Sequence, residues 1–446
     1  MRGERRRPAP PAADATAVLD DLALAEILLR LPSPATLART AALVCRRWRL
    51  VASSPAFLRR FRRLHPPPLL GFFVCRGGRP YRHRHFGDPL PGAPRDEGPL
   101  PALDPTFLPV AAPPPDAAGA VRRCGDFSLA SLPSVDHWAL ADARDGLLLL
   151  CSSCDRSTDG GDHLELRCIP QHFAVCDPLS GRSVLLPQRD ADMYIGSYYL
   201  GATLVITGDN DEGDFFSFEV LMATYFDKGP LLCAFSSSSQ EWAVFPCPAT
   251  EKLYDYRVPW IDDGARAGGC VYWVVHDWEM EFQHLLVLDT RAKKFSTMNL
   301  PTSDMCDKYD RNVKVVRSED DRDLRVVALA RPKCELHFWR RDWSRSAKGR
   351  WLKEDVVKFM KADGILHFLE GGNGCPFFGA MGLRMIGVGE GFVFFKHNDT
   401  PWVYVLNLKE MKLQKLPNRE MYSGYAIPYR MALSPPLPNL DQEGSH

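Results

Sequence analysis

Lysine is missing from the first half of this 446-residue sequence, in which Lys228 is the first one. Aspartate and glutamate are also absent between residues 27 and 87, where thirteen arginines occur. The whole chain carries 55 basic and 55 acidic residues, so this positive charge is local. It predicts attraction to an acidic partner, with compositional bias as the alternative. Nucleic-acid binding is disfavoured, because base-reading motifs and interleaved aromatic residues are missing.

Long apolar runs are missing as well. No run approaches the roughly 20 residues that a membrane-spanning helix needs. Residues 1–17 carry positive charge without the apolar core of a secretory signal. The thirteen cysteines are scattered, many of them within apolar runs, which is typical of reduced thiols. We therefore expect disordered tails at 1–17 and 431–446, no membrane contact, and a location in the cytoplasm and/or nucleus.

Catalytic and metal-binding motifs are not found. The sequence contains no G-x-x-x-x-G-K, H-E-x-x-H or G-x-S-x-G. Cys151-x-x-Cys154 has metal-like spacing, but a structural zinc site needs a second pair at similar spacing. Four aspartates lie beside predicted strands or turns, where this residue commonly bonds to its own backbone: Asp142, Asp145, Asp177 and Asp289. We predict no catalytic residue, no metal and no cofactor.

Three short amphipathic helices are predicted between residues 18 and 64. Apolar residues recur there at the spacing of one helical face: Leu24, Ile27, Leu28 and Leu31 in the first helix, Leu37, Ala41, Val44, Trp48 and Val51 in the second, and Phe57, Leu58, Phe61 and Leu64 in the third. Ser33-Pro34 and Ser54-Pro55 are start signals, each with an N-cap serine before a proline. So small a trio buries little core, so we expect it to need a partner surface.

The motifs ILLRLP (27–32) and VCRRW (44–48) resemble an F-box, particularly those of the large plant F-box families. The resemblance implies an F-box at 18–64 that docks on a Skp-type adaptor, and through it on a cullin, in an SCF ubiquitin ligase. Where the family usually opens with Leu-Pro, this sequence has VLDD (18–21). The resemblance implies these adaptor-binding residues: Leu22, Leu24, Ile27, Leu28, Leu31, Pro32, Leu37, Val44, Cys45 and Trp48.

After a Pro-rich hinge at 65–68, the pattern changes to short apolar runs of strand type. Examples are LLGFFV at 69, LLLLC at 147, TLVIT at 203, CVYWVV at 270, RVVALA at 325 and FVFF at 392. A strand–turn–strand unit that ends in an apolar-Pro step also recurs, beginning at 173, 231, 285 and 403, with a weaker copy at 335. Spacings of roughly 50 to 65 residues suit one four-stranded sheet per repeat.

A single sheet of this kind cannot bury both faces, so neighbouring repeats must stack and the ring must close. We therefore predict an α+β multidomain protein, in which the small all-α F-box precedes an all-β propeller of about six blades at 69–430. The repeat resembles a kelch-like or F-box-associated β-propeller. A pair of β-sandwiches is the alternative fold. A Pro-rich insert at 88–120 has little apolar content and is expected to be a mobile loop.

These features predict a non-catalytic substrate-recognition subunit whose propeller binds a protein target. Loops carry recognition on rigid scaffolds, and Tyr and Trp are favoured interface anchors. The candidate target-binding residues are Tyr194, Tyr198, Tyr254, Tyr256, Trp260 and Trp278. Packing of these rings between blades is the alternative. The other functional hypotheses are an interaction or scaffold protein without a ligase role, and a propeller enzyme.

Overall fold

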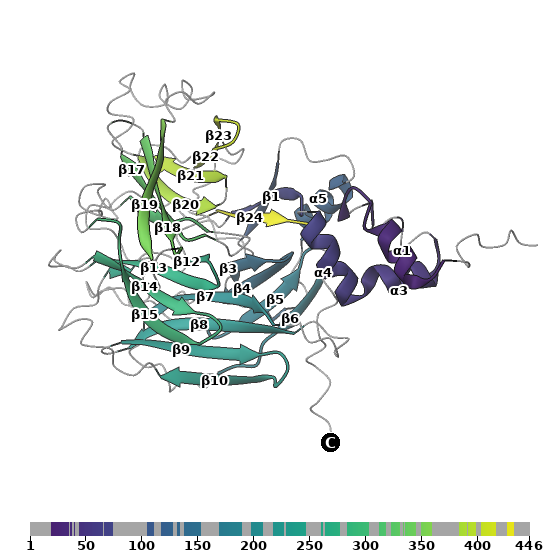
Figure 1. Ribbon diagram of the computed structural model, residues 1–446. Helices are drawn as coiled ribbons and strands as arrows, with labels where there is room; N and C mark the ends of the chain where they lie inside the picture. The colour runs from purple at the N-terminus through teal and green to yellow at the C-terminus, as the bar shows by residue number, and fades with distance from the viewer. Residues whose placement is uncertain are drawn as a thin grey trace, which may run out of the picture.

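The computed structural model contains a closed ring of β-sheets preceded by a small helical domain (Figure 1). No helix among the described residues is long and apolar enough to cross a membrane. The structure describes residues 19–34, 36–37, 40, 44–65, 67–74, 105–110, 117–127, 132–133, 138–152, 169–189, 198–207, 217–226, 229–246, 260–261, 264–276, 283–302, 312–317, 323–330, 333, 335–344, 349–358, 383–389, 391–397, 403–415 and 426–431. The predicted tail at 1–17 lies outside these residues, as does all but Met431 of the predicted tail at 431–446.

The helical domain contains α1 (Asp21–Leu28), α3 (Arg46–Ser53) and α4 (Pro55–Leu64). Between α1 and α3, helical residues are described at 34, 36, 37, 40 and 44. Both predicted start signals are confirmed: the Ser33 hydroxyl accepts a hydrogen bond from the Thr36 amide at 3.2 Å, and the Ser54 hydroxyl accepts one from Phe57 at 3.3 Å.

The predicted second helix was wrong in its extent. Cys45 has extended backbone angles, φ −163° and ψ 172°, and serves as the N-cap residue of α3. The apolar stripe from Leu37 to Val51 is therefore divided between two helices. Apolar spacing alone did not reveal the break, because the stripe keeps its helical period across Cys45.

The strands form six antiparallel sheets among the described residues. We number five of these sheets as blades in chain order. Blade 1 contains β3–β6, blade 2 contains β7–β10, blade 3 contains β11–β15, blade 4 contains β16–β19 and blade 5 contains β20–β23. Their strands are β3 (Trp138–Arg144), β4 (Leu147–Ser152), β5 (Phe173–Asp177), β6 (Arg182–Leu185), β7 (Tyr198–Ile206), β8 (Phe218–Phe226), β9 (Gly229–Ser236), β10 (Glu241–Pro246), β11 (Trp260–Ile261), β12 (Ala265–Ala267), β13 (Cys270–His276), β14 (Gln283–Asp289), β15 (Lys294–Asn299), β16 (Val313–Val315), β17 (Arg325–Ala330), β18 (Glu335–Asp342), β19 (Arg350–Lys358), β20 (Leu383–Gly389), β21 (Phe392–His397), β22 (Val403–Asn407) and β23 (Lys412–Lys415).

The sixth sheet closes the ring by joining the two ends of the propeller. In this closing blade, β1 (Leu69–Val74) pairs with β2 (Thr106–Pro109) on one side and with β24 (Ala426–Arg430) on the other. β24 also contacts β20 of blade 5 and β3 of blade 1, so the innermost strands form a continuous circle. Gly71 is required here, because a Cβ atom at this position would lie 2.2 Å from the Leu108 carbonyl oxygen. The predicted six-blade propeller is confirmed.

The expectation of a mobile insert at 88–120 was wrong for its described part. Residues 106–109 form β2, and α5 (Ala118–Gly125) begins within the insert. Phe107 packs against Phe73 with ring centroids 5.1 Å apart and the rings tilted by 54°, and Cys124 of α5 is fully buried. A low average apolar content concealed these few well-placed apolar residues, which gain their stability from the closing blade.

The apolar side chains between neighbouring blades form one cluster at each of the six interfaces. Because side chains alternate along a strand, Leu148 and Leu150 face the closing blade whereas Leu147 and Leu149 face blade 2. Both faces of each inner sheet are thus covered, which explains why these strands read as unbroken apolar runs. The repeated strand–turn–strand units are the two outer strands of blades 1 to 5.

Ring closure includes a buried polar link through the Tyr429 hydroxyl, which also contacts the buried Cys124 thiol. The Tyr429 hydroxyl of β24 donates a hydrogen bond of 2.8 Å to the carbonyl of Gly146 in blade 1. We expect Tyr429→Phe to lower the free energy of unfolding by about 1–3 kcal/mol, because a buried carbonyl loses its donor while the ring packing stays. Urea denaturation followed by fluorescence measures this difference. An unchanged midpoint would show that the link contributes nothing to closure.

Candidate functional site

The helical domain has a hydrophobic core of its own. Its buried members all lie between residues 24 and 61: Leu24, Leu28, Leu29, Leu37, Ala52, Phe57, Leu58 and Phe61. Polar contacts join the helices around this core. The His65 ring bonds to the Leu29 carbonyl at 2.7 Å, Arg47 forms an ion pair with Asp21 at 2.8 Å, and Arg60 pairs with Glu26. The domain is therefore folded without covering its remaining apolar surface.

That remaining surface is unusually apolar. In the described part of the chain, six large hydrophobic side chains are exposed, and five belong to the helical domain. Their exposed fractions are 79% for Leu22, 40% for Ile27, 46% for Val44, 62% for Leu50 and 57% for Leu64. Exposed apolar residues scattered singly over a protein are normal, whereas their concentration in one small domain indicates an interaction surface.

The structure divides the predicted adaptor-binding residues into three groups. Leu22, Ile27, Pro32 and Val44 are exposed, and Leu31, Cys45 and Trp48 are half-buried. Leu24, Leu28 and Leu37 are at most 1% exposed, so they hold the domain together and offer a partner no direct contact. Helical spacing identified apolar faces but did not distinguish a face that covers the internal core from one left for a partner.

Two exposed leucines were not among the predicted adaptor-binding residues. Leu64 was assigned only to the apolar face of the third helix. Leu50 lies on α3 outside the predicted stripe, between Arg49 and Val51. The sequence offered one signal that Leu50 is functional: it is a leucine that lies off the apolar stripe of a helix rich in arginine. Four arginines are also exposed on this domain: Arg30, Arg46, Arg49 and Arg60.

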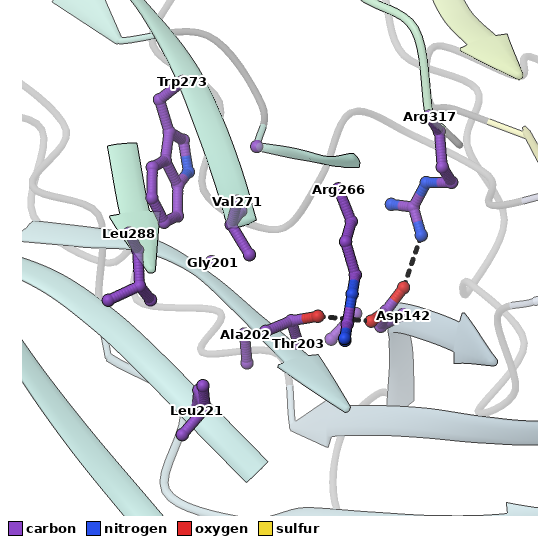
Figure 2. Close-up of a pocket in the computed structure, with 12 residues that line it drawn as sticks. Asp142, Gly201, Ala202, Thr203, Leu221, Arg266, Val271, Trp273, Leu288 and Arg317 are labelled. Atoms are coloured by element: carbon purple, nitrogen blue, oxygen red, sulfur yellow. Dashed lines mark hydrogen bonds and ion pairs between the residues drawn. The ribbon is translucent and has the colours of Figure 1, made fainter. Parts of the chain in front are cut away.

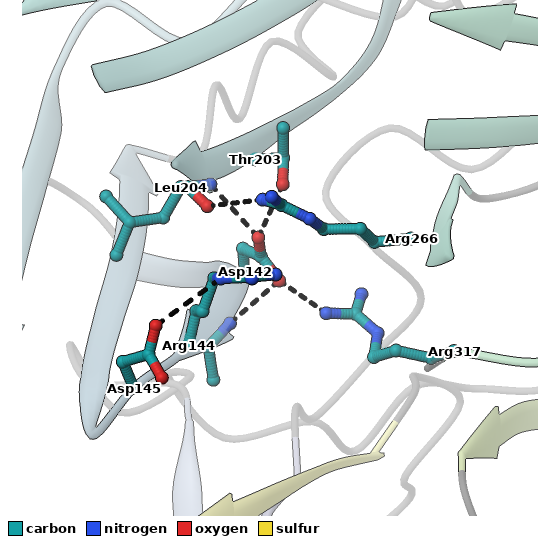
Figure 3. A network of polar contacts seen from close by, with 8 residues as sticks. Asp142, Arg144, Asp145, Thr203, Leu204, Arg266 and Arg317 are labelled. Atoms are coloured by element: carbon teal, nitrogen blue, oxygen red, sulfur yellow. Dashed lines mark hydrogen bonds and ion pairs between the residues drawn. The ribbon is translucent and has the colours of Figure 1, made fainter. Parts of the chain in front are cut away.

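A second site lies among the innermost strands of the propeller, where a buried polar cluster joins the blades (Figure 3). Asp142 of β3 is 3% exposed. Its carboxylate accepts hydrogen bonds from the Thr203 hydroxyl at 2.7 Å and the Leu204 amide at 3.0 Å, both in blade 2, and pairs with Arg317. Arg266 of blade 3 donates to the Leu204 carbonyl at 2.8 Å.

Burial alone would raise the pKa of Asp142. The Arg317 guanidinium, the hydrogen bonds from Thr203 and Leu204, and the Arg266 charge outweigh it and hold the pKa of this carboxyl below its ordinary value. Asp142 is therefore ionised at neutral pH. The backbone of Arg317 in turn bonds to the Val388 carbonyl at 3.1 Å, so the cluster reaches blade 5.

The expectation that Asp142 mainly bonds its own backbone was therefore incomplete. It does accept a hydrogen bond from the Ala143 amide, but most of its partners come from other blades. Asp177 and Asp289 do bond to the backbone of their own turns, as predicted. Asp145 occupies a turn position with φ 49° and lies 3.5 Å from the Arg144 guanidinium. No sequence signal indicated a partner of Asp142 that lies 175 positions away.

The cavity beside this cluster has a volume of about 20 Å³ (Figure 2). Asp142, Arg266 and Arg317 line its polar end, and Trp273 and Leu288 line its apolar end. A volume of this size holds about one water molecule. The arrangement suits a structural link between blades, in which one buried carboxylate accepts from blades 1, 2 and 4, and Arg266 of blade 3 bonds to the adjacent Leu204 carbonyl.

The predicted target-binding residues fall mostly outside the described residues. This applies to Tyr194, Tyr254, Tyr256 and Trp278, whereas Tyr198 and Trp260 are placed by backbone only, at the start of β7 and β11. Among the described residues, no group of three His, Cys, Asp or Glu side chains could hold a metal ion. Cys151 is buried in β4, and Cys154 lies outside the described residues.

Fold and surface together define a class of protein: a small helical domain with an apolar, arginine-rich exterior, followed by a six-bladed β-propeller. Residues 23–64 match the protein-family model described as F-box-like. This segment is an F-box-like domain. No curated protein matches the sequence.

Several solved structures are similar to this chain. Apo AztD from Citrobacter koseri has 12% identity and a TM-score of 0.26, over 66% of this chain and 63% of that one. Regucalcin, a calcium-binding protein from Agrobacterium tumefaciens, has 11% identity and a TM-score of 0.31, over 62% and 72%. The Dos1 propeller has 12% identity and a TM-score of 0.29, over 64% and 60%. The chain thus spans less than two thirds of the AztD and Dos1 chains.

Removal of the Asp142 charge tests the polar cluster. We expect Asp142→Asn to lower the free energy of unfolding by about 3 kcal/mol, because Arg317 and Arg266 lose the carboxylate that compensates their buried charge. Thr203→Val is the matched control and should cost only about 1 kcal/mol, since it removes a single hydrogen bond. Urea denaturation at pH 7 measures both. Equal effects of the two variants would contradict the assigned role of the charge.

The lowered pKa of Asp142 also predicts a pH dependence. An ordinary aspartate in the unfolded chain titrates near pH 3.9, and the folded protein releases this proton more readily. The stabilisation is therefore complete above that pH and is lost as the pH falls through the lower folded-state pKa. We expect the difference in unfolding free energy between the wild type and Asp142→Asn to shrink below about pH 4. A difference that grows on acidification would contradict this.

Proposed function

We propose that this protein is the substrate-recognition subunit of an SCF-type E3 ubiquitin ligase. The F-box-like domain docks on a Skp-type adaptor, and through it on a cullin, while the propeller binds a protein target. The observation that carries the proposal is the concentration of exposed large apolar side chains on a domain whose own core is already complete. The plant-type and kelch-like relationships belong to this proposal.

The exposed residues Leu22, Ile27 and Val44 are the docking surface in this proposal. Covering a leucine or isoleucine side chain contributes on the order of 1.5–3 kcal/mol when its apolar area is removed from water completely. Ala23 and Leu24, between Leu22 and Ile27, are less exposed and connect the surface to the core. The surface is thus held in place before a partner arrives, which lowers the entropy cost of binding.

Charge supports a partner that is acidic. The exposed Arg30, Arg46, Arg49 and Arg60 lie on the same small domain, and Glu26 is paired with Arg60. Positive charge around an apolar surface mainly speeds encounter with a negative partner and fixes its orientation. Adaptors of the Skp type are acidic, as the F-box resemblance implies.

The propeller contributes no chemistry in this proposal. It holds a target near ubiquitin-transfer machinery that resides in other subunits, so catalysis is by proximity. The six cysteines among the described residues form no disulfide, in keeping with the reducing conditions of the cytoplasm and/or nucleus. The target is a protein whose identity the proposal leaves open.

Adaptor binding tests this proposal directly. We expect Leu22→Asp combined with Ile27→Asp to weaken co-purification of the full chain with a Skp-type adaptor by about 100-fold or more, because two carboxylates replace apolar contacts. Ser53→Asp combined with Ala56→Asp is the matched control. These residues are also exposed on the helical domain, and the change adds the same charge without removing a large apolar side chain, so adaptor binding should persist.

Thermal unfolding of both variants checks that the helical domain still folds, which the exposure of all four residues leads us to expect. If the wild-type chain retains other partners but no adaptor or cullin, the protein is an interaction or scaffold protein without a ligase role. Retained adaptor binding by the Leu22/Ile27 variant would place the docking surface elsewhere.

A further inference from the structure

The sixth exposed large apolar residue of the described chain is Trp343, which lies outside the helical domain and is 44% exposed. It directly follows β18 in the outer hairpin of blade 4. The pairing of β18 with β19 places Arg341 opposite Trp351 and Trp339 opposite Lys353. Because alternate residues of a strand share a face, these four residues and Trp343 lie on one face of the hairpin. We call them the blade-4 tryptophan face.

The side chains of this face stack in an ordered series. The guanidinium carbon of Arg341 lies 5.5 Å from the Trp343 ring centre and 5.0 Å from the Trp351 ring centre, and the Lys353 ammonium lies 6.0 Å from the Trp339 ring. Trp339 is buried in the cluster between blades 3 and 4, whereas Trp351 and Arg341 are half-buried. The series therefore runs from the core to the surface and ends at Trp343.

Trp343 is held in position before any partner binds. Gly349 has φ +63°, and a Cβ atom there would lie 2.8 Å from the Trp343 ring and 2.8 Å from the Arg341 Nε atom. The Trp351 indole donates a hydrogen bond of 2.9 Å to the Asn299 carbonyl of blade 3, which fixes the base of the stack. An exposed aromatic side chain that is already ordered loses little entropy on binding.

The charges near Trp343 differ between the two faces of the hairpin. Asp342, which is paired in register with Arg350, and Glu354, which lies 3.5 Å from Arg340 and 3.6 Å from Arg325, are on the face opposite the tryptophans. The tryptophan face carries Arg341 and Lys353 near Trp343. At its far end it also carries Glu335, which lies 3.3 Å from the His337 ring and 3.5 Å from the Lys358 ammonium. On β15, the adjacent outer strand of blade 3, Lys294 and Ser296 are exposed and alternate with Phe295, so they lie on the side of Met298 that faces blade 4.

We propose that the blade-4 tryptophan face is a docking surface for an acidic peptide segment of the target protein. The flat sides of the Arg341 guanidinium stack on the indoles, and its positive charge lies beside Trp343. Lys353 adds a second positive charge, and Trp343 supplies the apolar anchor. The binding of an acidic peptide follows from the hairpin itself. Only the statement that the peptide belongs to the ligase target rests on the proposed function.

Peptide selection on the full-length chain tests the surface. The probe is a displayed library of random twelve-residue peptides, selected on the wild type and counter-selected on the variant Trp343→Ala/Lys353→Glu. We expect the surviving peptides to carry an excess of Asp and Glu and to bind the variant about tenfold or more weakly than the wild type. Their binding should also weaken as the salt concentration rises. The absence of survivors, or survivors without an acidic excess, would overturn the proposal.

Two further variants separate this surface from general charge and from misfolding. Lys409→Glu/Lys412→Glu reverses two exposed charges on blade 5 and should leave peptide binding unchanged. Gly349→Ala displaces Trp343 without altering charge and should weaken peptide binding, with thermal unfolding confirming that the ring is intact. If the blade-5 variant lost binding as strongly as the blade-4 variant, the surface would have no specific role.

Adaptor co-purification is measured on the same Trp343→Ala/Lys353→Glu variant. It should be unchanged, because this hairpin lies in blade 4 and the adaptor surface lies on the helical domain. If the chain selects acidic peptides but binds no adaptor, the peptide-docking surface is supported and the ligase role is refuted. If the chain binds the adaptor but selects no acidic peptide, the ligase role is supported and the peptide-docking surface is refuted.

Discussion

The pairing of β24 with β1 is the interaction on which the rest of the propeller depends. Each blade exposes two apolar faces that only its neighbours cover, so an open ring would leave two of them in water. The strand from the C-terminal end supplies the innermost position of the closing blade, and Ile427, Tyr429 and Met431 join the core cluster against blade 1. Folding of the ring therefore requires strands that lie more than 350 residues apart in sequence.

The same pairing also fixes where the helical domain leaves the ring. The hinge before β1 is bonded to the C-terminal strand, since the Met431 amide donates to the Pro68 carbonyl at 2.9 Å and Arg430 donates to Pro67 at 3.3 Å. The helical domain and the ring are thereby joined through a short, anchored connection. In the proposed ligase subunit, this connection would keep the adaptor and the target in a fixed relative orientation.

The polar cluster around Asp142 complements ring closure. Apolar packing between blades is non-directional, whereas one buried carboxylate with donors from separate blades fixes their relative positions. The outer rim repeats this principle with single indole hydrogen bonds, as Trp242 bonds to Pro187 and Trp351 to Asn299 of the preceding blade. These links make the ring a rigid support on which a few side chains, such as Trp343, can be held in an ordered position.

The sequence by itself determined the type and order of the elements, because helical and strand periods, N-cap serines and the recurring strand–turn–strand units are local properties. The recurring units predicted a propeller of about six blades for this reason, whereas the F-box-like domain was predicted from the resemblance of the motifs ILLRLP and VCRRW to that family. Only the tertiary structure decided which apolar residues of the helical domain are covered, that Cys45 divides the second helix, and that residues 106–109 complete the closing blade. It also decided the partners of Asp142. Each of these depends on contacts between distant segments, whose free energy no local pattern records.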